Sequence, residues 1–203
     1  MSVIDFKKEL KHLYNPSQQA FTVVDVPPMN FLMIDGEGDP NTNPDYQQVM
    51  NTLYAMAYGL KFALKPQGVE YVVPPLEGLW WAEEMSKFSL LDKGDWLWTM
   101  MVMQPEPVTA ELVERMRGEV ARKKELPALA RLRFETYHEG LAAQLMYVGA
   151  YADEGPTIAR LHAFIAEQGY QPAGKHHEIY LGDPRRTPPE KLKTVIRQPV
   201  RIA

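Results

Sequence analysis

The sequence predicts an α+β fold built from two strand-helix-strand-strand modules in tandem. The same order of elements is read in both halves of the 203-residue chain. A turn containing an acid, a glycine and a proline precedes each module's helix, at residues 36–40 and 153–156. Identity between the halves is slight, so the duplication is inferred from element order. A chain of this length suits one domain, residues 1–203, with one shared core.

The first half divides into an N-terminal lead-in over residues 1–29 and a first module over residues 30–105. The lead-in has helix-like apolar spacing at residues 5–14 and a strand pattern at residues 21–26. The module is expected to hold a strand at residues 31–34, an amphipathic helix over residues 46–60, and strands at residues 69–74, 79–81 and 96–103. The last strand is apolar on both faces and is therefore expected to be buried.

A connection over residues 106–140 leads to the second module over residues 141–203. The connection is expected to hold a helix at residues 109–123 and a strand at residues 131–137. The second module is expected to hold a strand at residues 141–151, a helix at residues 157–168, and strands at residues 176–181 and 195–202. Residues 187–190, Thr-Pro-Pro-Glu, form a capping-box pattern that predicts a helix start.

Composition excludes several classes of function. The net charge of −4 argues against nucleic acid as a partner, because nucleic-acid binders carry a basic excess. No apolar run approaches the ~18 residues of a membrane helix, so no membrane partner is expected. The absence of cysteine excludes disulfides and thiolate chemistry, and no secretory signal is visible, so we expect a cytoplasmic location. No cofactor and no metal site are expected.

Several blocks of the sequence resemble the bacterial GyrI-like proteins, whose fold also forms effector-binding domains of AraC-type activators and BmrR-type multidrug sensors. The lead-in is too short for a helix-turn-helix domain, so the chain resembles the stand-alone members. The blocks that carry the resemblance are Val24 to Pro27, Phe31 to Asn41, Tyr71 to Trp81, His176 to Arg186, Pro189 to Thr194 and Arg197 to Val200.

The resemblance implies two pseudo-twofold-related halves, an antiparallel sheet with helices on one side, and a central cleft for aromatic, often cationic, drug-like molecules. It implies that Glu178 is the central acid of that cleft. Among stand-alone members it points to hydrolysis of cyclopropane-bearing, DNA-alkylating toxins. Members often have histidine where this chain has Met146 or Tyr147, which is a departure from the family pattern.

Strand alternation places Glu178 and Tyr180 on one face and Ile179 and Leu181 on the other. If Ile179 and Leu181 face the helices, Glu178 faces the cleft. A carboxylate among aromatic groups has a raised pKa, which suits it to bind a cation or to exchange protons. We therefore expect Glu178 to be catalytic, with Tyr180 or Tyr147 assisting by hydrogen bonding.

Aromatic side chains are expected to line the cleft, where rings offer stacking and cation-π contacts. Trp80 and Trp81 are consecutive on a strand and should point to opposite faces, and Trp81 is expected to face the ligand. The expected ligand-binding residues are Trp81, Trp98, Tyr71, Tyr151 and Met146. His176 and His177 are expected to be surface residues, because adjacent strand positions diverge and no ligand cluster accompanies them.

Three functions remain open at this point. The first is a hydrolase of cyclopropanoid compounds that uses Glu178 on a water molecule or on a developing oxyanion. The second is a non-catalytic protein that binds and sequesters lipophilic cations. The third is a protein-interaction module similar to the gyrase inhibitor that gives the family its name. The expected partners are aromatic or cationic small molecules, and the chain is expected to be a monomer or a weak homodimer.

Overall fold

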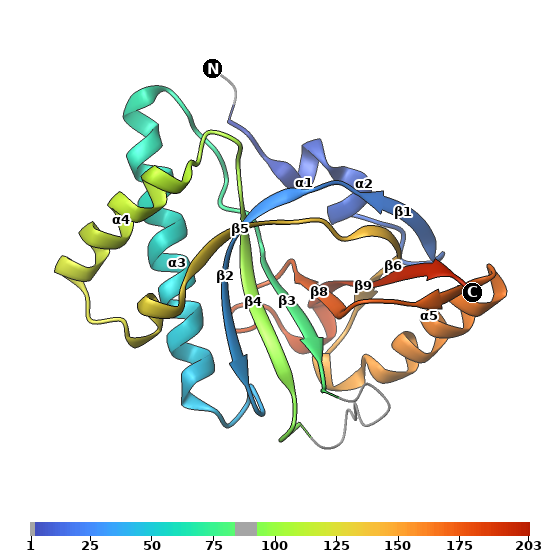
Figure 1. Cartoon of the computed structure of the whole chain (residues 1–203). Helices are drawn as coiled ribbons and strands as arrows, with labels where there is room; N and C mark the ends of the chain where they lie inside the picture. The colour runs from blue at the N-terminus through green and yellow to red at the C-terminus, as the bar shows by residue number, and fades with distance from the viewer. Residues whose placement is uncertain (1–2, 84–92) are drawn as a thin grey trace.

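The computed structural model describes residues 3–83 and 93–203 and shows one large curled sheet flanked by helices (Figure 1). The strands are β1 (Thr22–Val26), β2 (Met29–Glu37), β3 (Leu76–Trp81), β4 (Leu97–Gln104), β5 (Arg133–Tyr137), β6 (Gly140–Val148), β7 (Tyr170–Pro172), β8 (His176–Tyr180) and β9 (Lys193–Ile202). The helices are α1 (Phe6–Glu9), α2 (Lys11–Tyr14), α3 (Pro44–Leu64), α4 (Ala110–Lys123) and α5 (Gly155–Glu167). Across the described ranges, no helix combines the length and the apolar character needed to cross a membrane.

Sheet order confirms the predicted duplicated α+β fold. The strands pair in the order β1-β6-β9-β8-β3-β4-β2-β5, all antiparallel, and β7 adds to β9. One half therefore contributes β2-α3-β3-β4 and the other β6-α5-β8-β9, and the two halves meet where β3 pairs with β8. Each module's helix begins seven residues after its first strand ends, from Glu37 to Pro44 and from Val148 to Gly155. This common spacing supports descent of both halves from one module.

The pairing of β3 with β8 shows which residues of the two modules correspond to each other. Gly78 of β3 faces Glu178 of β8. A pseudo-twofold axis through this pair relates each β3 residue to the β8 residue with a number 100 higher, so Gly78 corresponds to Glu178 and Trp80 to Tyr180. The two halves therefore place different side chains at equivalent points of the same seam.

The sheet closes on itself and so has an interior face and an outer face. Val26 of β1 pairs with Gly140 of β6, and Met29 of β2 pairs with Tyr137 of β5 in the same register. Strands β1 and β2 therefore form one continuous ladder with β5 and β6, and this ladder joins the two ends of the sheet. Pro27 and Pro28 interrupt this long pairing, because proline has no N–H to donate. The interior face buries Tyr14 of α2 with residues of seven strands, whereas α3 and α5 pack on the outer face.

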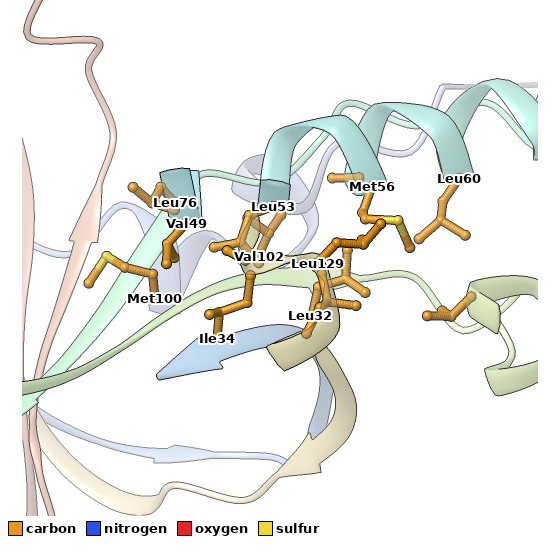
Figure 2. Packing of buried hydrophobic residues seen from close by; sticks show 14 of the residues in the cluster. Leu32, Ile34, Val49, Leu53, Met56, Leu60, Leu76, Met100, Val102 and Leu129 are labelled. Atoms are coloured by element: carbon orange, nitrogen blue, oxygen red, sulfur yellow. The ribbon is translucent and has the colours of Figure 1, made fainter. Parts of the chain in front are cut away.

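The long helix α3 is held by the largest apolar cluster (Figure 2). Asn43 caps its first turn by accepting a hydrogen bond from the N–H of Asp45, and Pro44 occupies the first turn. The stripe that packs on β2, β3 and β4 comprises Val49, Leu53, Met56, Ala57, Leu60 and Leu64, all almost fully buried. The helix therefore has a fixed position relative to the sheet.

Three local predictions were wrong. Residues 69–74 form no strand, since only Tyr71 bridges to Ile4 and Pro74 and Pro75 cannot donate to a ladder. The pattern at residues 187–190 opens only the short 3-10 turn Pro189–Lys191, without a side-chain cap. Gly36 and Glu37 lie inside β2 rather than in the turn.

A buried ionic network lies on the interior face behind β8. His177 donates to Glu77 through Nε2 at 3.0 Å and to Glu139 through Nδ1 at 2.9 Å. Arg197 donates to Glu139 at 3.1 Å and to the carbonyl oxygen of Leu13 in α2 at 2.7 Å. Burial opposes the charge of His177, but Glu139 and Glu77 raise its pKa to about 9, so the imidazolium persists at neutral pH. Two cations thus balance two carboxylates inside the sheet.

Removing one cation from this network is expected to be costly. Arg197→Ala leaves Glu139 buried beside a single cation and should lower the free energy of unfolding by ~3–5 kcal/mol. Arg201→Ala, on the exposed end of the same strand, is the matched control and should change it by less than ~0.5 kcal/mol. Urea denaturation followed by circular dichroism measures both, and equal effects would contradict a role for the buried charges.

Candidate active site

A cavity of about 1440 Å³ opens on the outer face of the sheet beside α3 and the start of α5. β3 and β8 supply its floor at the seam between the halves, through Trp80, Glu178 and Tyr180. Its volume exceeds the ~300–1000 Å³ of a usual small-molecule pocket. The site therefore lies where the two modules meet and has room for a large ligand.

Glu178 is fixed by two neighbouring side chains. Tyr180 donates to its Oε2 at 2.8 Å, and His176 lies 3.2 Å from its Oε1 through Nε2. Burial alone would raise the pKa of Glu178, but the hydrogen bonds from His176 and Tyr180 lower it overall. Trp80 donates from Nε1 to the hydroxyl oxygen of Tyr180 at 3.0 Å, which orients that hydroxyl toward the carboxylate. Glu178 is therefore held as an ionised carboxylate.

Glu154 supplies a second acid to the same cavity from the N-terminal end of α5. Its side chain is almost fully buried, and its Oε1 has no hydrogen-bond partner within residues 3–83 and 93–203. Burial and the charge of Glu178 raise the pKa of Glu154 to about 9. At neutral pH the site thus contains one carboxylate and one carboxylic acid, the pairing that general acid–base catalysis requires.

Aromatic rings enclose these acids. Tyr46 of α3 lies 6.4 Å from Trp80, measured between ring centroids, and Trp80 lies 5.3 Å from Trp96 in an edge-to-face contact. Tyr151 meets Tyr180 edge to face at 5.6 Å. The rings present planar apolar surface next to the acid pair, so the cavity suits a flat, conjugated ligand.

The structure brings together three of the predicted site residues. Glu178, Tyr180 and Tyr151 all line the cavity. Ile179 and Glu178 point to opposite faces of the sheet, as strand alternation predicted. Ile179 lies on the interior face with the α2 residues. Glu178 therefore lies on the outer face, where α3 and α5 pack. The condition that Ile179 faces the long helices was therefore wrong.

Five predicted site residues lie elsewhere in the described structure. Trp80, not Trp81, faces the cavity, and Trp81 stacks under Lys175 Nζ at 3.3 Å from the ring centroid. Trp98 is fully buried against α3 and donates to the carbonyl oxygen of Gly38. The others are Tyr71 in the α3 core, Met146 on the interior face, and Tyr147, which donates to the carbonyl oxygen of Ala150.

Sequence reasoning missed Glu154, Trp80, Tyr46 and His176. The expectation that His176 and His177 are surface residues was wrong, because both are almost fully buried. Their divergence was predicted correctly, since His176 contacts Glu178 and His177 contacts the interior network. In the sequence, Glu154 was visible only as an acid in the predicted turn before α5. Acidic residues in turns are normally solvated, so the sequence offered no reason to place Glu154 in a site.

A duplicated α+β fold with an acid pair in an aromatic cavity defines a small-molecule-binding protein. A family model described as "GyrI-like small molecule binding domain" matches residues 19–201, and the chain belongs to this family. A conserved protein from Listeria innocua is 43% identical over 98% of this chain and 100% of its own, with a TM-score of 0.90. A hydrolase from the same organism is 42% identical over the same shares, with a TM-score of 0.86. A search of curated proteins gave no match.

More distant structures share the fold alone. The C-terminal domain of EcmrR has a TM-score of 0.57 at 12% identity, covering 91% of this chain and 98% of that one. The match to the family model confirms the predicted family membership, and the Listeria innocua structure with a TM-score of 0.90 confirms the predicted fold.

Gly78 is expected to be required for the site. A Cβ at this position would meet Met100 Cε, Trp80 Nε1 at 2.8 Å and the Tyr180 hydroxyl at 3.1 Å. Gly78→Ala should therefore displace the Trp80–Tyr180 hydrogen bond, destabilise the fold by ~1–3 kcal/mol and weaken binding of a planar dye. Gly118→Ala is the control, because an added Cβ there would meet nothing within 4 Å apart from its chain neighbours and its own helix backbone, and this variant should be neutral or stabilising. Melting temperature and dye titration test both variants, and unchanged dye binding by Gly78→Ala would refute the role.

Proposed function

We propose that this protein is a hydrolase that adds water to planar, electrophilic small molecules, and that cyclopropane-bearing toxins are its substrates. The observation that carries this proposal is the pairing of an ionised Glu178 with a protonated Glu154 on the floor of an aromatic cavity. The resemblance to stand-alone GyrI-like hydrolases and the Listeria innocua hydrolases at 42% and 40% identity support it.

In the proposed reaction the conjugated part of the substrate stacks on Trp80 and Tyr46. Glu178 accepts a proton from a water molecule as the water oxygen bonds to a cyclopropane carbon. The strained carbon–carbon bond breaks, and its electron pair moves through the conjugated system to the carbonyl oxygen. Glu154 donates its proton to that oxygen, so one water is added and no other reactant is needed.

Tyr180 and His176 act on Glu178 rather than on the substrate. Their contacts hold both carboxylate oxygens, which fixes the orientation of the base before the substrate binds. Proton return from Glu178 to Glu154 then restores the starting state. The two acids line the same cavity and interact directly with each other, so the return needs no movement of the fold.

A second candidate is a non-catalytic protein that binds aromatic cations. It is favoured by the single negative charge of Glu178 inside aromatic walls, which would attract a planar cation. This candidate assigns no role to the proton of Glu154. Turnover therefore separates the two functions.

Glu178→Gln tests the role of the base. The variant keeps the shape of the side chain, so it should still bind a neutral planar ligand, while turnover of a conjugated cyclopropane compound falls by ~10² or more. Mass spectrometry of the water adduct measures turnover, and quenching of tryptophan fluorescence measures affinity. Glu190→Gln on the exposed 3-10 turn is the control. Full turnover in Glu178→Gln would remove this residue from catalysis, and absence of turnover in the parent protein would favour the binder.

The pH profile tests the role of the acid. Glu154 must carry a proton, so the rate should be constant at neutral pH and should fall as pH rises through about 9. Glu154→Gln should be slower at pH 7 and should lack this alkaline fall. His177 also loses its stabilising charge as pH rises through about 9, so circular dichroism must establish that both proteins remain folded at each pH. An alkaline fall of equal size in Glu154→Gln would refute the assignment.

A further inference from the structure

Lys93 places a positive charge in the cavity that contains Glu178 and Glu154. Its Nζ lies 4.8 Å from the ring centroid of Trp96, so the face of the ring holds the ammonium group by a cation-π contact. Trp96 in turn packs edge to face on Trp80, which lies on the floor of the cavity. The aromatic wall therefore positions a cation as well as offering apolar surface.

Lys93 acts electrostatically on both acids without forming an ion pair with either. Burial and the charge of Glu178 raise the pKa of Glu154 to about 9, whereas the charge of Lys93 acts to lower it. Burial alone would raise the pKa of Glu178, but its two hydrogen-bonding neighbours and the charge of Lys93 lower it. Within residues 3–83 and 93–203, Glu178 forms its ion contact with His176, and no ion pair joins Lys93 to either acid. All three groups line one cavity, so a ligand can lie between the cation and the acids.

The charges around the cavity favour anionic ligands over cationic ones. The basic lining residues in the described part of the chain are Lys7, Lys93, Lys124 and Arg185, and the acidic ones are Glu154, Glu178 and Asp183. Glu154 is protonated at neutral pH, so four positive charges face two negative ones. Arg185 and Asp183 offset each other in an ion pair at 2.9 Å, so the charge that remains is positive. A cleft lined mainly by one sign of charge concentrates ligands of the opposite sign.

We propose that Lys93 is the specificity-determining residue of the cavity, and that it selects planar ligands with a carbonyl or anionic oxygen over planar cations. Its ammonium group donates a hydrogen bond to that oxygen while the rings contact the planar part of the ligand. In the reaction, this placement rests on the proposed hydrolase function. There the oxygen is the carbonyl oxygen that gains negative charge as the cyclopropane bond breaks. Lys93 stabilises the oxyanion until Glu154 donates its proton to it.

Three naphthalene derivatives with the same substitution position and different charge test the selectivity. They are the carboxylate, the carboxamide and the aminomethyl compound, which is a cation at neutral pH. Isothermal titration calorimetry on the parent protein should show affinity falling in this order. Lys93→Met keeps the length of the side chain and removes its charge, so it should weaken carboxylate binding by about tenfold or more and should bind the cation more tightly than the parent does.

Matched variants separate charge from shape. Lys93→Arg keeps the charge and should preserve the order of affinities. Lys191→Met, on the exposed 3-10 turn and outside the cavity lining, is the control and should bind all three compounds as the parent does. Circular dichroism establishes that each variant is folded, and Lys93→Gln is the second uncharged variant if Lys93→Met does not fold.

Turnover of a conjugated cyclopropane compound, measured as the water adduct, distinguishes failure of this proposal from failure of the hydrolase. A carboxylate preference that Lys93→Met abolishes, in a protein without turnover, would support the selective role of Lys93 and overturn the hydrolase. A parent that prefers the cation, or an equal loss for all three compounds in Lys93→Met, would overturn the proposal, and turnover in that parent would keep the hydrolase. Where the parent turns over, Lys93→Met should lower the rate by about tenfold or more, and an unchanged rate would overturn the placement of the carbonyl oxygen at Lys93.

Discussion

Antiparallel pairing of β3 with β8 is the constraint on which the site depends. This seam joins the two modules, and its alternation directs consecutive side chains to opposite faces. Glu178 points into the cavity, whereas His177 points into the interior network with Glu77. The ion pairs behind the strand thus fix the position of the carboxylate in front of it. Loss of register by one residue would place His177 in the cavity and Glu178 among apolar side chains.

Buried charges are neutralised differently on the interior face and on the outer face of the sheet. Inside the sheet, His177 and Arg197 offset Glu77 and Glu139, so no uncompensated charge is buried. In the cavity, Glu154 and Glu178 repel each other, and the charge of Lys93 offsets this repulsion only in part, so Glu154 keeps its proton. The interior arrangement stabilises the fold, while the cavity arrangement stores a proton that can be transferred.

The sequence predicted the features that depend on local pattern. Alternation placed Glu178 and Tyr180 on one face, and periodicity placed α3, α4 and α5 to within a few residues. Alternation also showed that Trp80 and Trp81 diverge, but it could not decide which ring faces the ligand, because the choice depends on which face receives α3. Glu154 and the interior network were missed because they arise from contacts between distant segments. A buried acid looks like any turn acid until the strand that buries it is known.

Divergence between the modules is what makes the seam a site. At the equivalent positions Gly78 and Glu178, a second side chain would collide with Trp80 and Tyr180, and a second glutamate would also add a negative charge beside Glu154. At the next pair, Glu77 and His177 attract each other, where two identical acids would repel. Trp80 and Tyr180 likewise form a donor–acceptor pair that two tryptophans cannot form, since the indole N–H only donates. A symmetric duplicate could close the sheet, but only an asymmetric one can hold a single oriented carboxylate at its centre.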